Sequence, residues 1–279
     1  MKSKCSGQAG EKLIALFDVL HEAWVNRNRM LRVVRYDIKI ENRSFYLGTF
    51  WKVLSPLIQI GTFWLIFGLG IRGGSPIDGF PFLVWLLAGM VPWFFINRGI
   101  TTGSTSINTK SGIIFKIKYP IPTVPIGAIL HNLYDHVILL IILTLVLAAH
   151  GYYPNLYWLN LIYYISFTFI FLVALAMITS VIVRLAPDFG RLIASLLQML
   201  FFLTPILWQE THLPPWVLRV FSANPIRYIV NGFRNSLLYQ RNFFEFPWRI
   251  AFFWPVIIGI FAFGCWLQRK FAHRFADWM

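Results

Sequence analysis

Long apolar runs separated by short polar segments dominate the chain. Six of them approach or exceed the roughly 20 apolar residues that an α-helix needs to cross a bilayer. Their approximate ranges are 51–71, 80–96, 121–149, 161–183, 192–208 and 250–267. The pattern predicts an all-α integral membrane protein with six transmembrane helices. We expect one transmembrane domain over 1–279, in which 1–45 precede the first span, 46–208 hold spans one to five, 209–249 lie outside, and 250–279 form span six and a tail.

The composition agrees with this pattern. Hydrophobic residues make up 57% of the 279 residues and charged residues only 13%, whereas about 25% charged residues is usual for a soluble domain. This balance excludes a soluble enzyme. The basic residues, 25 Lys and Arg against 11 Asp and Glu, gather before the first span, after the second and fourth spans, and in the tail. Because Lys and Arg accumulate in cytoplasmic loops, both termini are predicted to be cytoplasmic.

The basic segment before the first span carries an apolar stripe at helical spacing. The stripe consists of Leu13, Phe17, Leu20, Trp24, Leu31, Val34 and Ile38. Such an amphipathic helix suits the membrane interface, where its Lys and Arg side chains meet anionic lipid headgroups. A solvated helix that binds a partner is the alternative. Nucleic-acid binding is not indicated, because nothing in the segment resembles a compact DNA-reading motif.

The basic loop after the second span reads NTKSGIIFKIKYP over residues 108–120. Apolar side chains among lysines are typical of a short helix that docks into a groove of a soluble partner. A connecting helix that lies on the membrane is the alternative. The loop does not bind nucleotide, since Thr109 stands where a phosphate-binding loop has its second glycine. The chain alone is therefore not expected to hydrolyse ATP.

Prolines divide the segment between the fifth and sixth spans. Pro214-Pro215 can open one short helix, and Asn224-Pro225 supplies an N-cap and a first-position proline for a second. The second helix has an apolar face of Ile226, Ile229, Val230, Phe233 and Leu237 and a polar face of Arg227, Asn231, Arg234 and Arg241. Helices too short to span predict a re-entrant hairpin that borders a pathway, because irregular backbone at membrane depth needs protein or water beside it. An extracellular cap is the alternative.

Few ionisable residues lie within the apolar runs. His131 and Asp135 share a helix face and are interpreted as a structural pair with Arg98, with a proton relay as the alternative. They lack the third and fourth ligands of a metal site, so no metal is expected. The sequence contains neither paired carboxylates nor a serine beside a base, so it gives no indication of a catalytic site. Aromatic residues of the spans belong to the interfacial belt or line a channel; the lining candidates are Tyr163, Phe167, Phe201 and Phe202.

Several stretches together resemble one family, the permease subunits of ABC type-2 exporters of surface polysaccharides. These stretches are RYDIKIENRSFYLGTFWKVLSPLI (35–58), LLAGMVPWFF (86–95), INTKSGIIFKIKYPIPTVPIGAIL (107–130), FFLTPILW (201–208), LPPW (213–216) and NPIRYIVNGFRNSLL (224–238). They occur in the family's order. Within the family, the chain is most similar to permeases that export wall teichoic acid.

The resemblance implies a homodimer in a bacterial cell membrane, two copies of a separate ATPase subunit that binds ATP and Mg, and a lipid-linked anionic polymer as substrate. It implies a coupling helix against that ATPase, containing Asn108, Lys110, Ile113, Ile114, Phe115, Lys116 and Lys118. It also implies re-entrant helices at an outer gate, containing Pro214, Trp216, Asn224, Pro225, Arg227, Asn231 and Arg234. One departure is Ile121, which follows Tyr119-Pro120 where family members often carry an Arg-Glu pair after Tyr-Phe-Pro. The contact made by that pair is not expected here.

Three alternatives remain open at this stage. Within the family, the polymer can be O-antigen or capsule instead of teichoic acid. A secondary transporter needs carboxylates near the membrane midplane, and Asp135 is the one buried acid of the predicted spans. A membrane-embedded glycosyl- or phosphoryltransferase needs a clustered acidic site, which the sequence does not contain.

Overall fold

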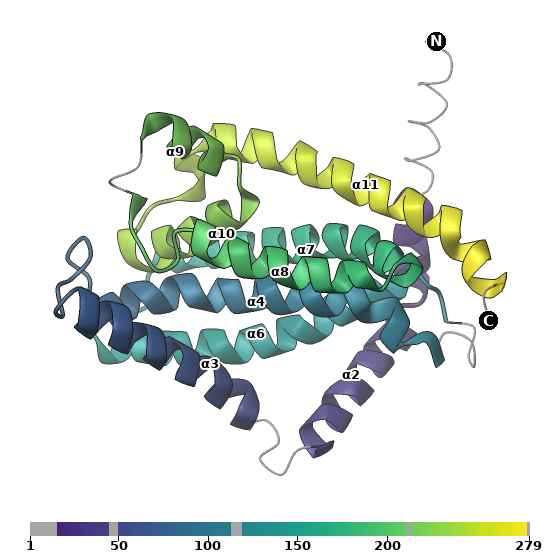
Figure 1. Cartoon of the computed structure of the whole chain (residues 1–279), viewed down its shortest axis with the longest axis horizontal. Helices are drawn as coiled ribbons and strands as arrows, with labels where there is room; N and C mark the ends of the chain where they lie inside the picture. Colours follow the sequence, from purple (N-terminus) through teal and green to yellow (C-terminus); the bar gives the residue numbers. More distant parts are fainter. Residues whose placement is uncertain (1–15, 45–49, 113–118, 211–213, 278–279) are drawn as a thin grey trace.

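The computed structural model describes residues 16–44, 50–112, 119–210 and 214–277, and this part of the chain is helical without a β-strand (Figure 1). The helices are α2 (Arg27–Ser44), α3 (Phe50–Phe63), η1 (Trp64–Ile71), α4 (Phe82–Thr109), α6 (Thr123–Ala149), η2 (Leu156–Leu159), α7 (Asn160–Leu185), α8 (Asp188–Leu203), α9 (Pro215–Ser222), α10 (Pro225–Arg234), η4 (Asn235–Tyr239), η5 (Phe243–Glu245) and α11 (Pro247–Asp277). The predicted all-α class is confirmed.

Five helical segments of the described chain are long and apolar enough to cross a membrane, and they correspond to predicted spans one to four and six. The predicted fifth span is α8, whose 16 residues extend only about 24 Å at 1.5 Å per residue. The helix ends at Leu203, five residues before the end of the apolar run, because Pro205 favours an extended conformation at Thr204 (ψ 135°). The sixth crossing therefore stays a prediction.

α4 is the most deeply buried of these segments and packs against α6, α7 and α10. Gly99 and Gly103, about one turn apart, face α7. A Cβ atom on Gly99 would lie 2.6 Å from Leu172 Cδ1, and one on Gly103 would lie 2.7 Å from Ala176 Cβ. Small residues four positions apart let membrane helices approach closely, so that van der Waals contact holds them together. These two glycines therefore set the distance between α4 and α7.

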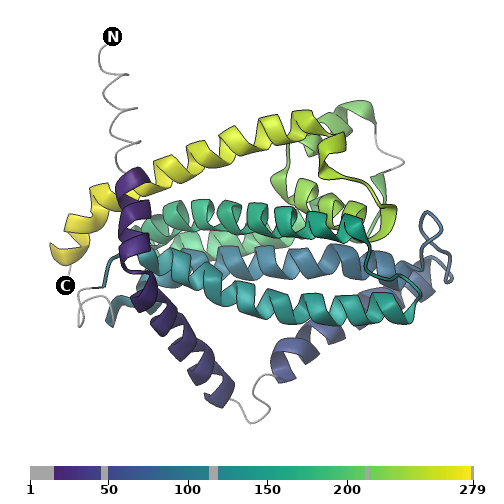
Figure 2. The same cartoon turned by 180° about the vertical axis from the view of Figure 1, so that it is seen from behind.

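The two ends of the helix bundle differ (Figures 1 and 2). α9, α10 and the start of α11 lie at one end, and the helix over residues 16–25 lies near the end of α11 at the other. An ion pair between Asp18 and Arg269 joins these last two elements. α2 packs against α6, where Gly127 lies beside Met30 and Val34. The described N-terminal segment is thus helical, and its place in the membrane interface stays a prediction.

The contact between α10 and α7 gives a test of the packing. A Cβ atom on Gly232 would lie 2.1 Å from Cε1 of Tyr164, whose side chain is buried. We predict that Gly232→Ala destabilises the protein by about 1–3 kcal/mol and lowers its thermal unfolding midpoint in detergent. Gly259→Ala in α11 is the control, because nothing lies within 4 Å of its Cβ position. Equal midpoints for the two variants would contradict this arrangement.

Candidate functional site

A cluster of charged side chains joins four helices within the bundle. Glu41 of α2 lies 2.8 Å from Lys52 of α3, from Arg98 of α4 and from His131 of α6. Asp135, one turn after His131, lies 2.8 Å from both Lys52 and Arg98. The Lys52 and Asp135 side chains are only 6% and 8% exposed. We call these five residues the ion cluster. It links α2 to α3, α4 and α6.

The sequence predicted part of this cluster. The expected contact of Asp135 with Arg98 is present, and His131 lies on the same helix face. Glu41 and Lys52 were missed. A lysine one residue inside an apolar run was the available signal, since a cation in a span needs a partner in the protein.

The cluster also contains three groups of the kind that bind metals. Ligand atoms of Glu41, His131 and Asp135 lie within 4.8 Å of one another. However, Lys52 and Arg98 already occupy the carboxylates of both acids, and their positive charges oppose a metal ion at the same place. Ion pairing therefore accounts for these side chains, and the absence of a metal site stays an expectation.

The same neighbours control the ionisation of Glu41, which belongs to α2 and not to a span. The His131 imidazole lowers the pKa of Glu41, burial opposes this effect, and Lys52 and Arg98 add to it, so that the pKa of Glu41 lies well below its usual range. Glu41 thus stabilises the fold at neutral pH. This contribution is lost as the pH falls below the ordinary glutamate value of 4.5.

The segment after α8 forms two short helices at the predicted positions. Pro215 is the first residue of α9, and Pro225 is the first of α10. The Asn224 side chain caps α10 by accepting a hydrogen bond from the backbone N–H of Ile226. The predicted apolar face of α10 is buried in the bundle, whereas Trp216 of α9 is 70% exposed. Whether the pair re-enters the membrane from outside stays a prediction.

Arg234 at the end of α10 is buried, not displayed on an open polar face. Its guanidinium donates hydrogen bonds to the backbone carbonyls of Pro205 (2.6 Å) and Ile206 (2.8 Å) after α8. It also lies over Trp85 of α4, 3.3 Å from the ring centroid. Gly89 makes room for it, since a Cβ atom there would lie 2.6 Å from the guanidinium. Arg234 thus fastens α10, α4 and the end of α8 together; we call this the Arg234 clamp.

The other polar residues of α10 border a cavity of about 500 Å³ at this end of the bundle. Arg227 donates to Glu210 through Nε (2.6 Å), and Asn231 reaches the same carboxylate. Burial raises the pKa of Glu210, but the hydrogen bonds and charge of Arg227, the hydrogen bond from Asn231 and the charge of Arg234 together outweigh it and hold the pKa below its usual range. The charged residues that line the cavity are Asp78, Glu210, Arg227, Arg234, Arg241 and Arg249. The walls therefore carry more positive than negative charge.

The predicted coupling loop is described only at its start. Ile113, Ile114, Phe115, Lys116 and Lys118 lie outside the described residues. Asn108 bonds to the end of α7, accepting a hydrogen bond from Arg184 (3.3 Å) and donating to the Val183 carbonyl (3.5 Å). Lys110 forms an ion pair with Asp37 of α2. Hydrogen bonds and an ion pair thus join the start of this loop to both α7 and α2.

The four aromatic lining candidates occupy different environments. Phe167 is completely buried among rings of α7, α10 and α11, and Tyr163 accepts a hydrogen bond from Trp254 Nε1 (3.1 Å). Phe201 is buried against Trp93. Phe202 is 57% exposed on α8. Of the four candidates, Phe202 has the most exposed side chain in this conformation.

Comparison with known proteins decides the family. Residues 31–238 match the family described as ABC-2 type transporter. The chain belongs to the ABC-2 type transporter family. With its apolar helices, this makes it a multi-pass membrane protein of a transporter family.

Several relatives are 23–24% identical to this chain over the aligned residues. The O-antigen export system permease protein RfbA of Klebsiella pneumoniae is 23% identical over 246 residues, 88% of this chain and 92% of that protein. The RfbA protein of Myxococcus xanthus is 24% identical over 68% of this chain and 72% of its own length. The polysialic acid transport protein KpsM of Escherichia coli is 23% identical over 72% and 78%, respectively.

The ion cluster can be tested by charge balance. Asp135→Asn leaves the buried Lys52 ammonium partly uncompensated, and we expect a loss of about 3 kcal/mol of stability. Adding Lys52→Met restores the balance and should recover more than half of the loss. Thermal unfolding midpoints of the single and double variants in detergent measure this. Strictly additive effects would show that the two side chains do not interact.

The Arg234 clamp gives a second test. A lysine cannot keep both hydrogen bonds and the contact with Trp85, so we expect Arg234→Lys to cost about 2–4 kcal/mol of stability. Protease cleavage in the 204–210 turn should become faster at the same time. Arg241→Lys is the control, because Arg241 is exposed and should tolerate the change. A midpoint for Arg234→Lys equal to that of this control would contradict the clamp.

Proposed function

We propose that this chain is the permease subunit of an ATP-driven exporter that moves a lipid-linked surface polymer from the cytoplasmic to the outer face of a bacterial cell membrane. Membership of the ABC-2 family over residues 31–238 carries the proposal. The names of the relatives, O-antigen export permease and polysialic acid transport protein, support a polymeric carbohydrate as cargo. The chain acts as a homodimer with two copies of a separate ATPase.

The polymer proposed from the sequence motifs is wall teichoic acid. The names of the relatives support O-antigen or polysialic acid as a second candidate, which fits the chain as well as the first. With the sequence motifs, this candidate is O-antigen or a capsule polymer. Both candidates are long, hydroxyl-rich chains built on a lipid anchor. The outer cavity suits a polymer that carries negative charge, because four arginines and two acids line it. Modest affinity serves export, since a tight site would hold the polymer back.

The ATPase partner supplies the ATP and Mg site in this proposal. The sequence contains no phosphate-binding loop, so we assign ATP hydrolysis to the partner and not to this chain. The ion cluster disfavours a secondary transporter, because Asp135 and Glu41 both form ion pairs with Lys52 or Arg98. A carboxylate that couples to an ion gradient needs to exchange its partner during transport.

In the proposed assembly, the apolar surfaces that one protomer exposes contact a second protomer or lipid. α3 is the least buried of the five long segments, and α8 exposes Phe189, Leu192, Leu196, Met199 and Phe202. We assign these surfaces to the second protomer and to lipid. The basic N-terminal helix faces anionic headgroups on the cytoplasmic side, where both termini lie.

The partner ATPase provides the direct test. We expect the chain to co-purify with the ATPase encoded beside it, and we expect Ile113→Asp with Phe115→Asp to abolish transport-coupled ATP hydrolysis in liposomes. Buried charge at a docked apolar helix disfavours binding. The matched control is Leu156→Asp, an 82% exposed leucine at the opposite end of the bundle, which should leave coupling intact. A chain that binds no ATPase and catalyses ion-driven flux would overturn the proposal.

A further inference from the structure

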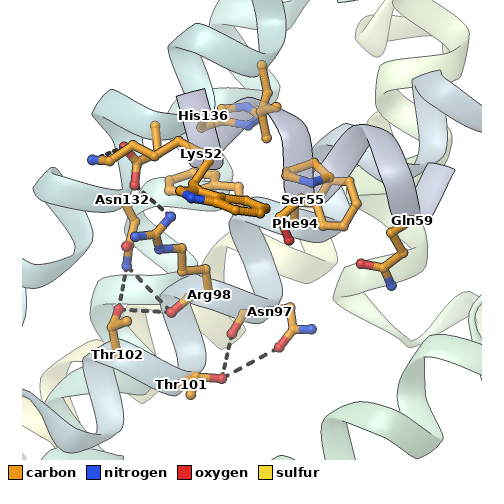
Figure 3. Close-up of a pocket in the computed structure, with 15 residues that line it drawn as sticks. Lys52, Ser55, Gln59, Phe94, Asn97, Arg98, Thr101, Thr102, Asn132 and His136 are labelled. Carbon is orange, nitrogen blue, oxygen red and sulfur yellow. Dashed lines mark hydrogen bonds and ion pairs between the residues drawn. The ribbon is translucent and has the colours of Figure 1, made fainter. Parts of the chain in front are cut away.

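A cavity of about 340 Å³, lined by both polar and apolar side chains, opens between α3, α4 and α6 beside the ion cluster (Figure 3). Each helix contributes one face to it. Trp51, Ser55 and Gln59 of α3 follow at intervals of four, as do Asn97 and Thr101 of α4. Residues at such spacing lie one above the other on a helix. Polar groups along one side of membrane-spanning helices favour a functional cavity over a lipid-facing surface.

His136 of α6 is the most unusual residue of this cavity. It is 1% exposed, and neither ring nitrogen has a hydrogen-bond partner among the described residues. Its ring stacks on Phe95 (centroids 4.6 Å apart) and meets Phe233 of α10 edge to face. A buried polar group without a partner is costly. Both ring nitrogens are closed to solvent in this conformation, so a ligand or water reaches them only when a neighbouring side chain moves.

The remaining polar side chains of the cavity can form hydrogen bonds, and the charges beside them sum to about zero. Asn132 bonds to Thr102, while Ser55 and Gln59 are exposed and Asn97 is half-buried, so these three lie toward the mouth of the cavity. Pro56 lacks an N–H, so the carbonyl of the residue one turn earlier in α3 has no helical donor at that position. The two cations that reach the cavity, Lys52 and Arg98, are balanced by Glu41 and Asp135.

These features fit a particular ligand chemistry. Amides, hydroxyls and imidazole nitrogens recognise hydroxyl groups, which both donate and accept. The balanced charge disfavours an ion as the main ligand. Trp51, 45% exposed at the mouth, offers an aromatic face. The volume lies at the small end of the 300–1,000 Å³ range of ligand pockets, which suits one ring or two rather than a chain.

We infer that this cavity binds a sugar unit of the lipid-linked polymer, with His136 as a ligand-contacting residue. The inference rests on the proposed function and adds a substrate site within each protomer. A second cavity of about 460 Å³ lies between α2, α4 and α6 and shares Arg98, Thr102 and Asn132 with the first. It gives the sugar a route of entry beneath the N-terminal helix. The contact of His136 with Phe233 connects the occupied cavity to α10.

The test compares two lipids on the complex of the chain and its ATPase in nanodiscs. The probes are a radiolabelled polyprenyl pyrophosphate carrying one N-acetylhexosamine and the same pyrophosphate without the sugar. His136→Phe keeps the ring stacking and removes both nitrogens. We expect it to weaken binding of the glycosylated lipid about tenfold, the effect of losing one to two hydrogen bonds, and to leave binding of the sugarless lipid unchanged.

Two further variants make the result independent of folding at a buried position. Asn97→Leu and Thr101→Val change the mouth of the cavity, where Thr101 is exposed, and should weaken binding of the glycosylated lipid several-fold. His150→Phe, at the exposed far end of α6, is the control and should bind both lipids as the wild type does. If His136→Phe does not fold, the binding of the glycosylated lipid by Asn97→Leu and Thr101→Val tests the sugar site.

The outcomes separate this inference from the proposed function. Equal binding of both lipids by the wild type, or unchanged binding in the cavity variants, would overturn the sugar site and make the cavity a water-filled one. If ATP-driven export persists in that case, the proposed function stands without the site. A complex that shows neither export nor ATP hydrolysis would refute the proposed function, whatever the binding results.

Discussion

The close packing of α4 against its neighbours is the constraint on which the rest of the structure depends. Lipid tails are as apolar as leucine side chains, so membrane helices gain little from hydrophobic burial against one another and rely on shape. Gly99 and Gly103 lack a Cβ atom and so allow close contact with α7, and Gly89 allows close contact with the guanidinium of Arg234. Because α4 is fixed in this way, the groups along it have fixed positions.

Three groups of contacts follow along this one helix. Trp85 near its start contacts the Arg234 clamp, Arg98 in its middle belongs to the ion cluster, and Asn108 near its end holds the start of the predicted coupling loop against α7. A movement imposed on the loop by a partner therefore reaches α4 directly. α3, by contrast, is little buried, and the ion pairs of Lys52 and the contact of Phe63 with Phe201 join it to its neighbours. We expect such an element to shift more readily than α4.

The sequence predicted the features that depend on local pattern. Apolar runs located five long helices, and Asn224-Pro225 located the start of α10, because capping and a first-position proline act within one turn. The end of α8 was placed five residues late, although Pro205 was a readable signal. Contacts between distant segments were predicted less well. Glu41 and Lys52 meet only because α2 folds against the spans, and the burial of Arg234 depends on Trp85 and Gly89, which lie about 150 residues earlier.

The most direct test of the account is polymer export itself. The chain and its partner ATPase, reconstituted so that ATP reaches the cytoplasmic face from outside the vesicle, receive a lipid-linked polysaccharide in the outer leaflet. We predict that ATP makes the polymer resistant to an externally added glycosidase, and that an ATPase subunit unable to hydrolyse ATP abolishes this protection. Protection that appears without ATP, or that follows an ion gradient alone, would contradict the account.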